Sequence, residues 1–191
     1  ALDPRRGSTS TVGGRLTDAR QVSRFTLGYT VSYASQKPRD DNPLTFRNDY
    51  FLGELKAGVA GFTLALGDEI LHGNGIAGFT TPLATLHGFQ GWADKFVTTP
   101  ANGIDDRYGS IAWSTHRVAV LNSLSATAAY HDFSAERLSA GYGREWDLMV
   151  SGKWHDFTAM LKYADYMAAA DTPSAIATAT EKFWAQLEYV L

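Results

Sequence analysis

The chain has 191 residues, 17 basic and 20 acidic side chains, a net charge of -3 and no cysteine. This length suits one domain or part of a larger one, and the charge balance offers no basic surface for nucleic acid. The absence of cysteine excludes disulfides, thiolate metal sites and cysteine nucleophiles, and no apolar run is long enough for a membrane-spanning helix.

Apolar residues recur at every second position along most of the chain, which indicates β-strands. Between residues 24 and 32 the even positions are small or polar, whereas the odd positions carry Phe25, Leu27, Tyr29 and Val31. The alternation predicts about nine strands, at residues 8–17, 22–34, 48–58, 61–71, 106–116, 122–132, 144–154, 157–167 and 180–191. Most of them reach the roughly 9–11 residues of a tilted membrane-spanning strand.

The connections between these strands alternate in length. Short ones are expected at residues 18–21, 59–60, 118–121 and 155–156, and long ones at residues 35–47, 72–105, 133–143 and 168–179. Outer-membrane barrels have this pattern, because their periplasmic turns are tight and their outer loops are long. The sequence therefore predicts an all-β fold, a portion of an antiparallel transmembrane β-barrel.

The strand count suggests that the barrel is larger than this chain. With long loops outside, the first and last predicted strands both run toward the periplasm. Single-chain bacterial barrels have even strand numbers. We therefore expect residues 1–191 to be the C-terminal part of one outer-membrane barrel domain, with upstream strands missing.

The polar face of each predicted strand is assigned to the inside of the barrel. A Lys or Arg that faces lipid costs about 2–4 kcal/mol at the bilayer midplane, so charged side chains in strand interiors are expected to line a watery pore. Mixed signs suit hydrophilic solutes, and clusters of Lys and Arg favour anions. The predicted pore-lining residues are Arg24, Glu54, Lys56, Glu145, Asp147, Lys153, Lys162, Lys182, Gln186 and Glu188. The alternative is the solvated outer face of a soluble sheet.

The loop at residues 72–105 is long enough to have a role of its own. Leu86, Phe89, Trp92 and Phe96 follow one another at helix-like spacing. One interpretation is a short amphipathic turn that folds against the barrel wall or into its lumen and constricts the pore. The other is a compact loop that caps the outer rim with a small core.

Aromatic residues are expected near strand ends or on the lipid face, where barrels carry aromatic girdles. Ordinary cross-strand packing is the alternative for any one of them. The residues concerned are Trp113, Trp146, Trp154, Tyr163, Tyr166, Phe183 and Tyr189.

The sequence gives little support for catalysis, and we expect neither an enzyme nor a metal or other cofactor. The five histidines form no H-x-x-x-H pair, and there is no G-x-S-x-G motif. Asp68 and Glu69 are neighbours on a predicted strand, so their side chains face opposite sides. Ser125, Thr127 and His131 share a face, but nothing singles them out as a catalytic group.

Several segments resemble alginate-export-type outer-membrane proteins, in their C-terminal half. The segment from Phe79 to Asp106 is the most specific; the others are 48–50, 129–133, 142–147 and 182–184. The resemblance implies a large porin-like barrel in the bacterial outer membrane. Its partners would be outer-membrane lipid, a hydrophilic solute or an anionic polysaccharide such as alginate, and the barrel-assembly machinery, which reads the C-terminal strand.

Two other functions remain open at this stage. A self-contained barrel of eight to ten strands would have a filled interior and an adhesive or structural role. An outer-membrane enzyme would need a serine and a histidine within hydrogen-bond reach of each other.

Overall fold

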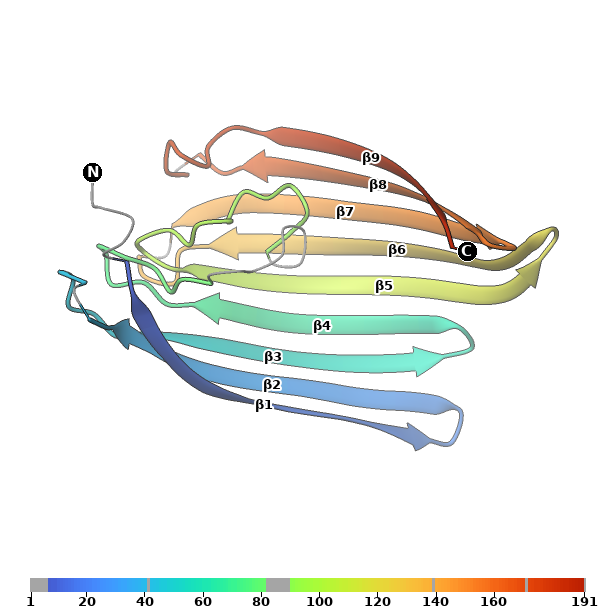
Figure 1. Cartoon of the computed structure of the whole chain (residues 1–191), viewed down its shortest axis with the longest axis horizontal. Coiled ribbons are helices and arrows are strands. Elements are labelled where there is room, and N and C mark those ends of the chain that lie inside the picture. Colours follow the sequence, from blue (N-terminus) through green and yellow to red (C-terminus); the bar gives the residue numbers. More distant parts are fainter. Residues whose placement is uncertain (1–6, 41, 82–89, 139, 171, 191) are drawn as a thin grey trace.

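A computed structural model describes residues 7–40, 42–81, 90–138, 140–170 and 172–190. These residues form one antiparallel sheet of nine strands, in which each strand pairs with its neighbours in sequence (Figure 1). The all-β antiparallel fold that the alternation predicts is thus confirmed. The strands are β1 Thr9–Val22, β2 Phe25–Pro38, β3 Asn48–Val59, β4 Phe62–Leu71, β5 Ile104–Val118, β6 Leu121–Ser134, β7 Gly141–Trp154, β8 Phe157–Ala168 and β9 Thr180–Tyr189.

The tight turns lie at one end of the sheet and the long loops at the other (Figure 1). Each tight turn has two residues between paired strand ends, at 23–24, 60–61, 119–120 and 155–156. In the second turn Ala60 and Gly61 both have positive φ, 51° and 84°, as the commonest two-residue hairpin requires. The predicted alternation of short and long connections is confirmed.

The first hairpin differs from the prediction. β1 extends to Val22, and its turn is at Ser23 and Arg24, not at residues 18–21. Charged and glycine residues interrupt the alternation along β1, but its backbone pairs with β2 throughout. Arg24 was predicted to lie inside a strand and to line the pore. It lies in a tight turn instead, so this prediction is wrong.

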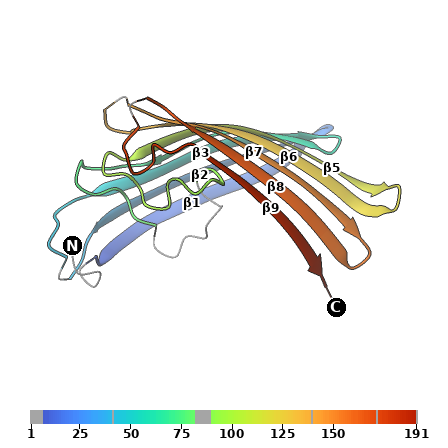
Figure 2. The same cartoon turned by 90° about the horizontal axis from the view of Figure 1, so that it is seen from above.

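The two faces of the sheet have opposite character. The convex face carries large apolar side chains that are exposed; among them are Leu27, Val31, Leu55, Leu64, Leu66, Ile111, Trp146, Leu148, Val150, Leu161, Phe183 and Leu187. The concave face carries polar side chains, and those that are buried include Thr30, Ser32, Gln36, Glu69, Asp106, Glu145 and Asp147. Figure 2 shows the arch of the sheet and the loop between β4 and β5 on its concave side. In a water-soluble antiparallel sheet the apolar face is buried against the core and the polar face is exposed to water, whereas here the apolar face is exposed.

Aromatic side chains mark both ends of the apolar convex face. Toward the tight turns, Phe157 packs against Trp154 and Tyr189. Toward the long loops, Tyr130 packs against Trp146 with ring centroids 4.8 Å apart. One step beyond that pair the same face becomes charged, with Asp68, Arg107, Asp132 and Arg144 opposite one another on adjacent strands.

Trp146 and Trp154 lie eight residues apart on β7, which is about 27 Å of extended strand. A strand tilt of about 40° reduces this to roughly 20 Å, close to the apolar band of about 25 Å in outer-membrane barrels. Tyr166 does not belong to this arrangement. It is fully buried on the concave side, so its predicted place in an aromatic girdle is wrong.

The main apolar core lies at the long-loop end, between the strand ends and the loops that cover them. Its members come from three loops and five strands: Leu71, Phe79, Ala93, Phe96, Ile104, Phe133, Ala135, Tyr142, Ala164, Tyr166 and Ile176. Phe96 is at its centre, because its ring contacts those of Phe133, Tyr142 and Tyr166. In the part of the chain that the structure describes, no helix is long and apolar enough to cross a membrane.

Gln36 ties the start of the long loop to β2. Its side chain is fully buried; its amide nitrogen donates to the Thr80 carbonyl (2.8 Å), and its amide oxygen accepts from the Thr80 N–H and hydroxyl (2.9 Å each). Asn48 on β3 donates in the same way to the carbonyl of Ala77. The loop is therefore positioned by side chains that project from the concave face.

We predict that Gln36→Leu loosens the loop locally. The substitution removes three hydrogen bonds between the buried Gln36 side chain and the exposed Thr80, at a cost of about 1–3 kcal/mol in total. The opening free energy of the Thr80 amide, measured by hydrogen exchange, should fall by that amount. Gln21→Leu, at the exposed end of β1 beside the first turn, is the control and should change nothing at Thr80. Equal protection in both variants would contradict the assignment.

Candidate functional site: the concave face and its loop

Antiparallel pairing brings distant residues into rows across the concave face. Directly paired residues lie on the same face of a sheet. One row runs Glu54, Gly67, Tyr108, His131, Glu145 and Tyr166. The next runs Lys56, Ala65, Ser110, Ala129, Asp147, Ala164 and Lys182.

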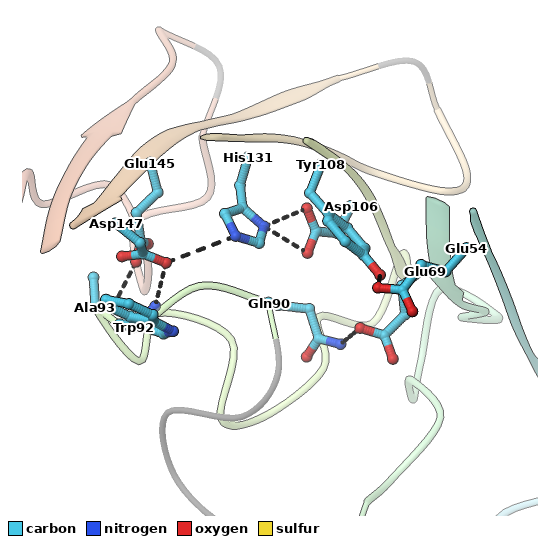
Figure 3. A network of polar contacts seen from close by, with 10 residues as sticks. All are labelled: Glu54, Glu69, Gln90, Trp92, Ala93, Asp106, Tyr108, His131, Glu145 and Asp147. Atoms are coloured by element: carbon cyan, nitrogen blue, oxygen red, sulfur yellow. Dashed lines mark hydrogen bonds and ion pairs between the residues drawn. The ribbon is translucent and has the colours of Figure 1, made fainter. Parts of the chain in front are cut away.

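A largely buried histidine, His131, joins carboxylates from two strands (Figure 3). Nδ1 of His131 lies 2.9 and 3.0 Å from the two carboxylate oxygens of Asp106, and Nε2 lies 3.7 Å from an oxygen of Asp147. Tyr108 stacks on the imidazole and donates its hydroxyl to Glu54 (2.9 Å). The histidine therefore holds two carboxylates of the concave face in place.

Glu69 connects this group to the loop. It accepts one hydrogen bond from the hydroxyl of Tyr50 (2.7 Å) and another from the side-chain amide of Gln90 (2.8 Å). Both Glu69 and Gln90 are buried. Each oxygen of the carboxylate thus has a donor, as a buried carboxylate requires.

The segment from Gln90 to Phe96 is fastened to β7 through its backbone. The Ala93 N–H donates to Glu145 (2.6 Å) and the Trp92 N–H donates to Asp147 (3.2 Å). Gly91 lies directly on the Glu145 carboxylate: a Cβ here would be 2.6 Å from it. Only glycine allows this contact without displacement.

Lysines from β8, β9 and the loop gather on the other side of the same segment. Nζ of Lys162 lies 4.0 Å from the centroid of the Trp92 ring, and Lys182 donates to Asp94 (2.7 Å). Lys95 donates to the Thr178 carbonyl and the Thr180 hydroxyl. Partial burial lowers the pKa of Lys95, and the charge of Lys182 lowers it further.

A polar cavity of about 400 Å³ lies between the sheet and the loop. Its lining mixes cationic, anionic and hydroxyl groups: Arg15, Tyr50, Leu52, Glu54, Lys56, Glu69, Gln90, Gly91, Trp92, Asp106, Tyr108, Ser110, Thr127, Ala129 and His131. Such a surface can bind or pass hydrated solutes through hydrogen bonds. The described residues hold no cluster of three or more His, Asp and Glu suited to a metal ion.

The predicted pore-lining residues other than Arg24 lie at concave-face positions of their strands. Glu145, Asp147, Lys162 and Lys182 are brought together beneath or beside the loop. Glu54 and Lys56 form an ion pair (2.9 Å) on the far wall of the cavity. A further group, Lys153, Gln186 and Glu188, stays exposed near the tight turns and does not join the network.

The structure describes two of the four residues that were predicted to form a constricting turn, Trp92 and Phe96. Leu86 and Phe89 lie outside the described residues. Trp92 packs over Lys162, and Phe96 belongs to the apolar core. The described segment from residue 90 to 103 contains turns but no helix, and the N–H groups of Trp92 and Ala93 donate to Asp147 and Glu145. The segment lies against the concave face of the sheet and contributes Ala93 and Phe96 to the apolar core; the constriction of a pore stays a prediction.

The sequence singled out Glu54 and Asp147 as pore-lining residues but not His131 or Asp106, which lie in contact with each other. Tyr50, Glu69, Asp106, Tyr108 and His131 share the concave-face alternation with Glu54 and Glu145, so the alternation itself was an available signal. Their mutual contacts depend on the pairing register of β3 to β7, which a single sequence does not state. As predicted, Asp68 and Glu69 face opposite sides: Asp68 is opposite Arg107 and Glu69 opposite Asp106.

Comparisons with protein-family models, with curated proteins and with solved structures give no match for this chain.

We predict that Gly91→Ala displaces the loop from β7 and that Gly75→Ala does not. Both glycines have positive φ, +81° and +87°, and alanine costs each roughly 1 kcal/mol of backbone strain. At Gly75 the nearest neighbour of an added Cβ is 3.9 Å away, whereas at Gly91 it is the Glu145 carboxylate at 2.6 Å.

Hydrogen exchange at the Ala93 amide measures the difference. Its protection should fall in Gly91→Ala and stay at the wild-type value in Gly75→Ala. A similar fall in both variants would mean that the contact with Glu145 does not hold the loop.

Proposed function

We propose that this chain forms part of the wall of a bacterial outer-membrane β-barrel, and that its concave face lines a porin-like channel for hydrophilic solutes. The convex face would contact lipid. The segment from residue 90 to 103 would narrow the lumen from within. The resemblance to alginate-export-type proteins supports the same proposal, with an anionic polysaccharide such as alginate as one candidate solute.

The reversed polarity of the sheet is the observation that carries this proposal. Leu66, Leu148 and Leu187 are 58%, 43% and 71% exposed, whereas Glu145 and Asp147 are fully buried. A soluble monomer rarely exposes a contiguous apolar patch larger than a few hundred Å². A bilayer around the convex face would cover these side chains, and the aromatic and charged belts would then lie at the level of the lipid headgroups.

The channel proposal rests on the polar character of the concave face. Glu54, Lys56 and Arg15 line one side of the cavity there, and Lys162 and Lys182 lie beyond Trp92 on the other. Mixed charges favour hydrated solutes over apolar ones. The lysines on β8 and β9 would favour anionic groups on that side.

A closed barrel would need strands in addition to these nine. Within the described residues β1 pairs only with β2, and β9 pairs only with β8. Because all pairs are antiparallel, β1 and β9 run in the same direction and cannot pair antiparallel with each other. An odd number of further strands would close the ring, and β9 would offer its edge both to them and to the barrel-assembly machinery.

We predict that labels on β7 alternate between lipid and water. Since the chain has no cysteine, nitroxides can be placed at single sites in Leu148→Cys, Val150→Cys and Ser151→Cys. In bilayers, dissolved oxygen should relax the labels at 148 and 150, and a water-soluble nickel complex should relax the label at 151.

Val120→Cys in the tight turn is the control, because its label should be accessible to the nickel complex in either case. Nickel accessibility at 148 and 150 together with oxygen accessibility at 151 would refute the membrane orientation. If the labels at 148, 150 and 151 were equally accessible to oxygen and equally accessible to the nickel complex, the proposal that β7 is part of a barrel wall would be refuted.

We predict that a charged thiosulfonate reagent lowers solute flux through the channel in Thr127→Cys but not in Ala128→Cys. The two positions are adjacent on β6; Thr127 lines the concave cavity, and Ala128 is opposite Leu148 on the convex face. Flux of a small sugar acid is measured across membranes that contain the closed barrel, in which the nine strands of this chain carry the substitution. Block at both sites, or at neither, would contradict a lumen on the concave side.

A further inference from the structure

Glu145 and Asp147 form a pair of buried acids beneath the loop between β4 and β5. Because they are two residues apart on β7, both side chains project from the concave face, and Figure 3 shows their carboxyl groups side by side. Both residues are fully buried, and their side chains lie within hydrogen-bond reach of each other. Two carboxylates this close repel each other strongly where water is excluded.

The loop supplies one donor to each member of this acid pair and leaves one oxygen of each without a donor. Oε1 of Glu145 accepts from the Ala93 N–H, and Oδ2 of Asp147 accepts from the Trp92 N–H. Oε2 of Glu145 and Oδ1 of Asp147 accept no hydrogen bond from any described residue. Gly91 covers the first of these oxygens, since a Cβ at this glycine would be 2.6 Å from Oε2, and its Cα offers no N–H or O–H donor.

The cations around the acid pair compensate for one negative charge, on the side of Asp147. From β6, Nε2 of His131 lies 3.7 Å from Oδ2 of Asp147, and Lys162 on β8 acts electrostatically on the same carboxylate. Glu145 interacts electrostatically with Lys95 of the loop, whose ammonium donates to two threonines of the loop after β8. The other ionisable groups of the elements packed around the pair have partners of their own: Asp106 with His131, Glu69 with Tyr50 and Gln90, Lys182 with Asp94, and Tyr166 with the Tyr142 carbonyl.

We propose that Glu145 and Asp147 share one proton, which Glu145 donates to Asp147, and that this proton holds the segment from residue 90 to 96 against β7. A proton between the two oxygens without donors gives each of them a hydrogen bond. It also leaves the pair with a single negative charge, which His131 and Lys162 compensate.

Loss of the shared proton as the pH rises releases the loop. The second buried charge then needs donors that the protein does not supply, and water is the source of them. Because Gly91 covers Oε2 of Glu145, hydration of that oxygen requires the segment to leave the sheet. The acid pair is therefore a pH-sensitive latch between the loop and the concave face.

In the proposed channel, release of the latch would widen the passage along the concave face at alkaline pH. This role as a gate rests on the channel proposal. The shared proton and the release of the loop are measured without conduction, so their failure and the failure of the channel proposal are distinguishable.

Infrared spectroscopy of the closed barrel that contains these nine strands tests the shared proton. A protonated carboxyl group has a carbonyl band that a carboxylate lacks. Since buried carboxyl groups are documented to keep a proton up to about pH 8–9, spectra are recorded from about pH 6 to about pH 10. We expect one such band to disappear over this range and to be missing from Glu145→Gln at every pH. Glu188→Gln, at an exposed position near the tight turns, is the control and should keep it. If the same bands titrate in the wild type and in Glu145→Gln, the proposal is overturned.

Hydrogen exchange at the Ala93 amide tests the release of the loop. Its rate is divided by that of the Thr80 amide, which Gln36 holds, so that the intrinsic dependence of exchange on pH cancels. In the wild type this ratio should rise about tenfold or more over the same pH range, because the repulsion of two adjacent buried charges is large. A ratio that does not change with pH in the wild type would contradict the latch.

Two variants separate the acid pair from other titrating groups such as His131. In Glu145→Gln the amide nitrogen can donate to Asp147 while the amide oxygen accepts from Ala93, and in Asp147→Asn the roles are exchanged, with Trp92 as the donor. Both variants imitate the shared proton permanently, so the exchange ratio should be independent of pH in each. A wild-type response to pH in both variants would assign the titration to another group and overturn the proposal.

A metal ion between the two carboxylates is the rival to a proton. Exchange at the Ala93 amide is therefore also measured at neutral pH with EDTA, and with sodium replaced by a bulky organic cation. The ratio should not change. A rise on removal of either cation would show that a metal ion holds the pair, which would overturn the shared proton.

Discussion

The structure depends on one constraint, the separation of apolar and polar side chains onto opposite faces of a strongly curved sheet. The apolar set is on the convex face, where no second layer formed by the described residues covers it. Burying a leucine, valine or phenylalanine side chain stabilises a protein by about 1.5–3 kcal/mol. A face lined with such residues therefore gains a large free energy when it is covered by an apolar phase. An apolar surrounding supplies that gain, and water does not.

The same separation forces carboxylates onto the concave side, and the loop between β4 and β5 makes their burial tolerable. A buried carboxylate needs donors or a counter-charge. Glu145 accepts a hydrogen bond from the Ala93 N–H, and Asp147 accepts one from the Trp92 N–H. Asp106 is paired with the imidazole of His131. The loop and the acids therefore depend on each other: the acids order a segment without regular secondary structure, and that segment keeps water away from the acids.

Much of the fold could be predicted from the sequence because the side-chain period of a strand is two. Along β2 and β7 the alternation is nearly unbroken, and the faces of both strands were correctly assigned, although β2 runs from Phe25 to Pro38 and not from residue 22 to 34, and β7 begins three residues earlier than predicted. β1 was predicted too short, because Gly13, Gly14 and Asp18 hide the period while the backbone continues to pair with β2. The lengths of the connections carried as much information as the strands, because a two-residue turn such as Ala60–Gly61 leaves little freedom in register.

The site could be predicted only as a face, not as a set of contacts. Alternation places Glu145 and Asp147 on the concave side, but it gives no reason for His131 to lie between Asp106 and Asp147, which requires the register of three strands.

Tyr166 is a residue for which the sequence pattern allowed two different positions. Its alternation assigns it to the concave side, yet an aromatic residue near a strand end also fits a girdle, and composition alone cannot separate the two. Phe96 decides the matter, because its ring comes from the loop, far away in sequence, and packs against the ring of Tyr166. Long-range packing of the loop, and not the strand pattern, therefore determines which concave residues form the site.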